Sequence, residues 1–142
     1  MIVQDFGLPD YDWRIRVYYA VTTYWTDVIV NDLMRIGCGG CELRDAYMSL
    51  RRGELDTELT YSNRSTHESI MVIGLTSSAA QFQNSLDHEK GHLIKHISVA
   101  FGLDPYGEEQ QYLSGEIGQR MFPVARKFLC EHCRRKLYEE RY

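Results

Sequence analysis

The feature that most constrains the fold is a run of helix signals between residues 78 and 105. Ser78, with Gln81 three residues later, forms a capping box, the pattern that satisfies free backbone amides at the start of a helix. Gly102 and Pro105 are typical of a helix end. Apolar residues between these signals recur at spacings of three, four and seven, the period of one helical face: Phe82, Leu86, Leu93, Ile97 and Ala100. We therefore expect one long helix over residues 79–101.

Weaker signals along the rest of the chain predict a small sheet and several further helices. We expect a strand within 12–23 and two strands at 59–62 and 69–75 that are joined by a polar turn. We also expect helices over 26–36, 41–52, 106–121 and 123–139, the last of which begins at Pro123. No repeat or low-complexity tract divides the chain. The sequence therefore predicts a single, mostly helical α+β domain over residues 1–142, with a small antiparallel or mixed sheet.

Composition excludes several classes of protein. Hydrophobic residues make up 44% and charged residues 25% of the chain, which excludes a disordered polypeptide. The formal charge is −4, whereas nucleic-acid-binding proteins usually carry an excess of basic residues, so we expect no nucleic-acid partner. No apolar run approaches the ~18 residues of a membrane span. Residues 1–12 carry three aspartates and no basic residue, unlike a secretory signal, so we expect a cytoplasmic protein without a membrane partner.

The predicted long helix contains the motif His88-Glu89-Lys90-Gly91-His92, which has the HExxH pattern. Two histidines at i and i+4 face the same side of a helix, so their imidazoles can bind one Zn²⁺. The intervening Glu89 leans toward the open position of the metal, where it can take a proton from water and pass it to a leaving amine. The motif therefore predicts a zinc site in which His88 and His92 are ligands and Glu89 is the general base.

A catalytic zinc normally has three protein ligands, so one more must come from outside the motif. A metzincin would place a third histidine six residues after His92, but that position is Ser98, which excludes this class. An acidic cluster opens the next predicted helix, and an antiparallel helix could lower one of its carboxylates onto the metal. The candidates are Glu108, Glu109 and Glu116.

The motif with a glutamate on the following helix resembles the gluzincin branch of zinc metallopeptidases. It is most similar to small cytoplasmic zincin-like proteins of phages and mobile elements, over about residues 69–120. Their second helix often reads E-x-x-x-[D/N/Y], with the glutamate as ligand, and Glu108 and Tyr112 match this spacing. The resemblance implies a zincin-like domain with a long active-site helix and Glu108 as third ligand, with Glu109 as the alternative.

Two further residues have candidate auxiliary roles. His96 stands four residues after His92, a placement shared with the anti-repressor-cleaving peptidases of mobile elements. It could stabilise an oxyanion or hydrogen-bond the ligand glutamate, or simply be a satisfied histidine near the helix end. Tyr112 could polarise a substrate carbonyl, because its hydroxyl can donate a hydrogen bond, or it could be a packing residue.

The four cysteines form two CxxC pairs, Cys38 with Cys41 and Cys130 with Cys133. Four thiolates could hold a second, structural zinc, although a zinc ribbon separates its pairs by only ~15–20 residues. Cys38 and Cys41 precede a predicted helix, which could lower a thiol pKa as in redox motifs. The remaining alternative is that all four are free thiols.

The sequence thus favours a zinc-dependent hydrolase that cleaves a peptide or protein substrate. One alternative is a catalytically inactive zincin-like binding protein of a phage or mobile element. Another is an interaction module built on a cysteine-bound zinc. The sequence carries no signal for an oligomeric state.

Overall fold

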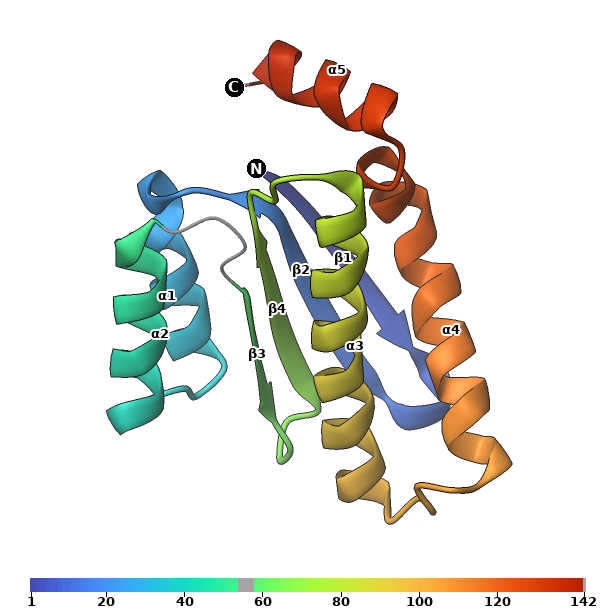
Figure 1. Ribbon diagram of the computed structural model, residues 1–142. Helices are drawn as coiled ribbons and strands as arrows, with labels where there is room; N and C mark the ends of the chain where they lie inside the picture. Colours follow the sequence, from blue (N-terminus) through green and yellow to red (C-terminus); the bar gives the residue numbers. More distant parts are fainter. Residues whose placement is uncertain (54–57, 142) are drawn as a thin grey trace.

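A computed structural model describes residues 1–53 and 58–141 of the chain. Its four strands form one sheet in the order β1 (Ile2–Leu8), β2 (Trp13–Val21), β4 (Glu68–Gly74) and β3 (Glu58–Asn63) (Figure 1). β1 is antiparallel to β2, β2 is parallel to β4, and β3 is antiparallel to β4. The predicted α+β class with a small mixed sheet is therefore confirmed, and so is the hairpin of β3 and β4.

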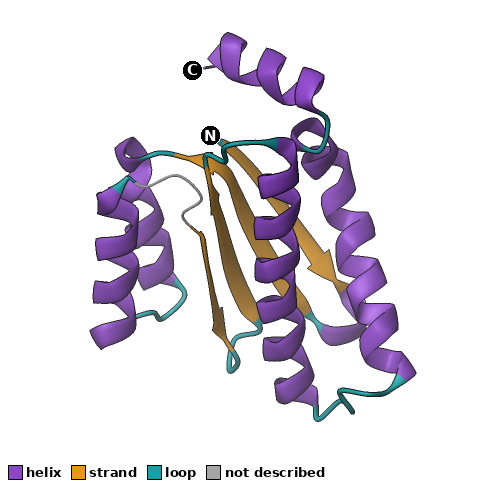
Figure 2. Ribbon diagram, in the orientation of Figure 1, coloured by secondary structure: helices purple, strands orange, loops and turns teal. Residues whose placement is uncertain are grey.

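Helices cover both faces of the sheet (Figure 2). α1 (Thr26–Arg35) and α2 (Gly40–Arg52) lie on one face, and α3 (Ala79–Phe101) and α4 (Glu108–Ala125) lie on the other. α5 (Glu131–Arg141) follows α4 after a short turn and lies beyond the end of the sheet. No helix among the described residues is long and apolar enough to cross a membrane.

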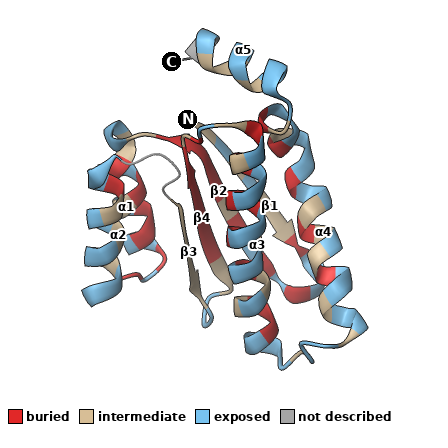
Figure 3. Cartoon of the chain, in the orientation of Figure 1, coloured by how far each residue is buried: buried red, intermediate tan, exposed pale blue. Residues whose placement is uncertain are grey.

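The alternation of side chains along β2 explains the two helical layers. Ile15, Val17 and Tyr19 belong to the hydrophobic cluster under α3 and α4, whereas Tyr18 belongs to the cluster under α1 and α2. β4 divides in the same way, so both faces of the two central strands are largely buried, except at Arg14 and Arg16, near the start of β2 (Figure 3). The sheet is thus a rigid layer against which α3 is held.

The prediction for α3 is confirmed at both ends. The hydroxyl of Ser78 accepts a hydrogen bond from the backbone N–H of Gln81, as a capping residue does. Gly102 follows the helix in the left-handed conformation, with φ of 64°, which ends the helix without steric strain. These local signals fix the register of α3 and therefore the direction in which its histidines point.

Two elements differ from the sequence prediction. β1 was not predicted, because Gln4 interrupts the apolar side of the strand. The side-chain amide of Gln4 accepts a hydrogen bond from the Tyr19 hydroxyl and donates one to the backbone carbonyl of Arg120. Pro123 does not open a helix but lies inside α4, close to its end. A proline there removes one backbone hydrogen bond. Buried residues on either side, Met121 and Ala125, keep the helix packed.

Candidate metal centre

The candidate site lies between α3 and the edge strand β3. Alternate residues of β3 point to opposite faces of the sheet: Leu59 and Tyr61 pack toward α1 and α2, whereas Glu58, Thr60 and Ser62 lie toward α3. These three polar residues contact, in order, His88, Glu89 and His96. A polar seam therefore joins the HExxH face of α3 to one side of the strand.

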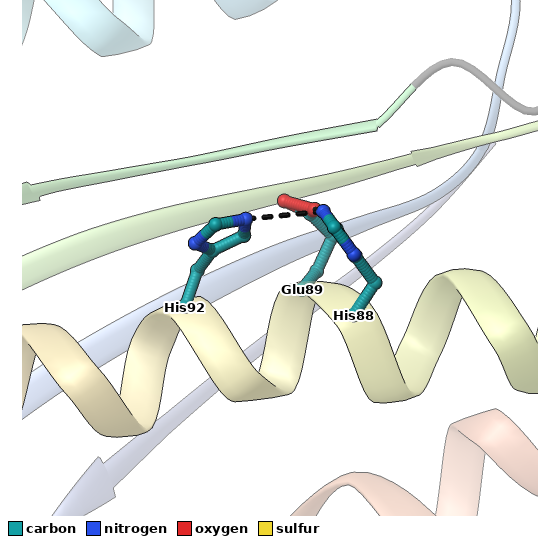
Figure 4. A group of neighbouring side chains, drawn as sticks. All are labelled: His88, Glu89 and His92. Carbon is teal, nitrogen blue, oxygen red and sulfur yellow. Dashed lines mark hydrogen bonds and ion pairs between the residues drawn. The ribbon is translucent and has the colours of Figure 1, made fainter.

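The two histidines of the motif have the geometry of a metal-binding pair. Their Nε2 atoms lie 3.1 Å apart and share a hydrogen bond, and both rings project from α3 toward the sheet edge together with Glu89 (Figure 4). Two nitrogens bound to one tetrahedral zinc at about 2.0–2.1 Å are about 3.3 Å apart. His88, Glu89 and His92 each offer a ligand atom within 4.8 Å of the others. The predicted grouping of these three residues is therefore present in the fold.

Glu89 is oriented by its surroundings. It is only 2% exposed, and Oε1 accepts a hydrogen bond of 2.9 Å from the Thr60 hydroxyl. Oε2 lies 4.0 Å from Nε2 of His88, so it faces the space beside the histidines. Burial and the negative charge of Glu58 raise the pKa of Glu89. The hydrogen bond from Thr60 and the nearby His88 lower it, but the net effect is an increase. A carboxylate held in this way suits proton transfer.

Glu58 is a candidate third ligand that sequence reasoning missed. Its Oε1 lies 3.8 Å from Nε2 of His88, and its Oε2 is buried without a hydrogen-bond partner among the described residues. A buried, unpaired carboxylate oxygen is unfavourable unless a cation satisfies it. Two imidazole nitrogens and a carboxylate form a donor set that Zn²⁺ accepts. Glu58 approaches His88 but is not among the three residues whose ligand atoms all lie within 4.8 Å of one another. The signal in the sequence was the alternation of polar and apolar residues from Glu58 to Ser62.

The structure does not bring the predicted ligands Glu108 and Glu109 to the histidines. A side chain at Gly118 would contact Nζ of Lys90, so α4 packs against the side of α3 opposite His88. Glu108 is ten residues from Gly118, which is about 15 Å along the helix axis. Glu109 lies near Tyr11 instead and helps to raise the pKa of its hydroxyl after burial, and Glu116 pairs with Arg120. The expectation of a ligand from α4 is corrected because α4 faces the wrong side of α3.

His96 belongs to a chain of hydrogen bonds that reaches into the core. Its Nδ1 lies 2.6 Å from the Ser62 hydroxyl, which lies 2.7 Å from the Ser69 hydroxyl, which accepts the indole N–H of Trp13 at 2.8 Å. Burial, followed by the positive charge of Arg64, lowers the pKa of His96. His96 also borders a polar cavity of about 440 Å³, lined in part by Thr60 and Arg64. Its role is to join α3 to the sheet beside the site.

Tyr112 and the cysteines lie outside the site. Tyr112 is 74% exposed on α4. Cys38 and Cys41 are at the start of α2, while Cys130 and Cys133 are at the start of α5, near the opposite end of the molecule (Figure 1). The structure therefore does not bring the two pairs together for a shared zinc, and all four are free thiols.

Comparisons with protein-family models, with curated proteins and with solved structures found no match to this chain. The resemblance to gluzincins consequently rests on the motif alone.

Proposed function

We propose that the protein is a zinc-dependent hydrolase of peptide bonds, with His88, His92 and Glu58 as the metal ligands. The observation that carries the proposal is the 3.1 Å separation of the two Nε2 atoms, with two carboxylates facing His88. When bound, zinc would act as a Lewis acid on water and on the substrate carbonyl. A cytoplasmic site of action is part of the proposal.

Glu89 is the general base of the proposed reaction. The Thr60 hydroxyl donates a hydrogen bond to Oε1 of Glu89, and Oε2 faces His88. In the proposed reaction Oε2 therefore accepts the proton of the attacking water. The same oxygen then returns this proton to the leaving amine, since the carboxyl group is anchored throughout.

The surroundings of β3 favour an extended peptide as substrate. β3 is the last strand of the sheet and pairs only with β4 among the described residues. A polar hollow of about 440 Å³ and a mainly apolar one of about 230 Å³ border it and share Glu42, Thr60 and Tyr61 in their walls. A peptide that adds to such an edge gains backbone hydrogen bonds along its length. A strand bound here would pass Glu89 and the two histidines.

Metal content tests the ligand set. Wild type should bind one zinc per chain by elemental analysis, and His88→Ala with His92→Ala should abolish it. Glu58→Ala should weaken zinc affinity by more than about 100-fold, because even the loss of an outer hydrogen-bond partner costs 10–100-fold. Glu108→Ala is the matched control and should leave affinity unchanged. Equal affinities in the Glu58 and Glu108 variants would remove Glu58 from the site.

Cleavage of a degenerate peptide library tests the reaction. Wild type with zinc should cleave, and the double histidine variant should not. Zinc bound stoichiometrically at His88 and His92 without cleavage of any peptide would overturn the hydrolase and support a metal-containing binding protein instead.

A further inference from the structure

The second CxxC pair begins α5 in a defined geometry. The carbonyl of Cys130 accepts the N–H of Arg134 at 2.8 Å, so Cys130 is the capping residue of the helix and Cys133 lies in its first turn. The backbone and thiol of Cys133 and the backbone of His132 lie close enough to the Cys130 thiol to lower its pKa. Helical residues three apart have Cα atoms about 5 Å apart, within the span of a disulfide. Both thiols are exposed.

Contacts on both sides hold this turn in place. The backbone N–H of Ala79, at the start of α3, donates a hydrogen bond of 2.5 Å to Oε1 of Glu131. The guanidinium of Arg134 donates to the carbonyl of Thr76 and lies 4.6 Å from the ring centre of Tyr138. The two thiols therefore lie on an anchored turn rather than on a free chain end.

A small cationic hollow lies beside Cys133. It has a volume of about 250 Å³ and is lined by Lys127, His132, Cys133, Lys136 and Leu137. Two lysines at a shallow hollow favour a ligand with carboxylates. An anionic molecule seated there would lie directly against a thiol.

We propose that Cys130 and Cys133 form a thiol–disulfide exchange site for a small acidic disulfide of the glutathione type. The Cys130 thiolate attacks one sulfur of the disulfide, which forms a mixed disulfide and releases one small thiolate. The Cys133 thiolate then attacks the Cys130 sulfur, which closes the protein disulfide and releases the second small thiolate. Two protein thiols are oxidised, one small disulfide is reduced, and the two protons end on the two small thiols.

The electrostatics agree with the order of attack. Hydrogen bonds from the backbone of Cys133, from its thiol and from the backbone of His132 lower the pKa of Cys130. The thiol contact with Cys130 raises the pKa of Cys133. A thiolate capped by helix amides is the usual attacking group of a CxxC pair.

The other CxxC pair is an internal control with the same spacing. Cys38 is buried in the cluster under α1 and α2, and burial raises the pKa of its thiol. Gly39 caps α2, so Cys38 precedes the helix and its sulfur does not occupy the capping position. Spacing alone would make the two pairs equivalent, whereas the burial of Cys38 and its place before α2 distinguish the first pair from the pair at α5.

Peptide mapping after exposure to glutathione disulfide tests the proposal. The folded wild-type protein is incubated with glutathione disulfide and a chelator, free thiols are alkylated, and the protein is digested with trypsin. Residues 128–134 should be recovered without alkylation and two hydrogens lighter, whereas residues 36–44 should carry two alkyl groups. Full alkylation of 128–134, or equal oxidation of both peptides, would overturn the exchange site.

Three variants and a second probe test the mechanism and the choice of ligand. Cys133→Ser should trap glutathione on Cys130, and Cys130→Ser should react more slowly at Cys133; adducts formed equally fast in both variants would contradict the order of attack. Lys136→Gln should slow reaction with glutathione disulfide about fivefold, the effect of one charge at close range in water. Cystamine, a cationic disulfide, should show the reverse preference. Equal rates with both probes would overturn the acidic ligand.

Discussion

The hydroxyl of Thr60, on β3, donates a hydrogen bond of 2.9 Å to Oε1 of Glu89, on α3. The contact joins the edge strand of the sheet to the middle of the HExxH motif. It satisfies one oxygen of a buried carboxyl group and leaves the other facing His88. The strand therefore determines how the motif is oriented, although the two segments are separated by 29 residues.

Thr60→Val tests this contact by removing the hydroxyl at nearly constant volume. Oε1 of Glu89 would stay buried without its donor, so the free energy of unfolding should fall by about 1–3 kcal/mol. Urea unfolding measures the change. Thr66→Val, at an exposed position of the turn between β3 and β4, is the matched control and should change stability by less than about 0.5 kcal/mol. If the two variants unfold alike, the hydrogen bond does not stabilise the fold.

Glu89→Gln separates catalysis from metal binding. Glutamine keeps the shape and the acceptor for Thr60 but loses the basic oxygen, so turnover should fall by about 10²–10⁴-fold. Zinc content should not change, because His88, His92 and Glu58 are intact. Both quantities are measured on the same preparation with a peptide cleaved by wild type. Turnover equal to that of wild type would exclude Glu89 as the base even where zinc is present.

Leu93→Ala tests the packing that holds the motif. Leu93 follows His92 directly but is fully buried in the cluster between α3 and the sheet. Truncation should lower the free energy of unfolding by about 2–5 kcal/mol through lost burial and the cavity left behind. Val99→Ala, on the same helix but 54% exposed, should have a much smaller effect in the same denaturation series. A small effect at Leu93 would mean that α3 is held by other contacts.

The sequence predicted the site to the extent that it depends on local signals. The bounds of α3 and the grouping of His88 with His92 follow from capping and helical periodicity within one segment. Glu58 could not be assigned in this way, because its role depends on which face of β3 meets which face of α3. The prediction that Glu108 is a ligand was wrong for the same reason. It depended on which side of α3 packs against α4, and local sequence signals do not determine this.

Asp32 on α1 gives a prediction for the pH dependence of stability. Its carboxylate is 8% exposed and accepts hydrogen bonds from the Tyr18 hydroxyl at 2.6 Å, from Arg35 at 2.7 Å and from Arg16 at 3.2 Å. Burial alone would raise the pKa of Asp32, but the Tyr18 hydrogen bond and the two guanidinium groups outweigh it and the pKa is lowered. The folded state therefore favours the ionised form.

A carboxyl group whose folded-state pKa is lowered stabilises the protein above its unfolded pKa of about 3.9. This stabilisation is lost as the pH falls through the lower, folded-state pKa. Asp32→Asn should therefore be less stable than wild type at pH 7, and the difference in free energy of unfolding should shrink below about pH 4. Denaturant unfolding from pH 2 to 7 measures both proteins, with the exposed Asp45→Asn variant as control. A difference that stays constant down to pH 2 would show that the charge of Asp32 does not contribute to its stabilising role.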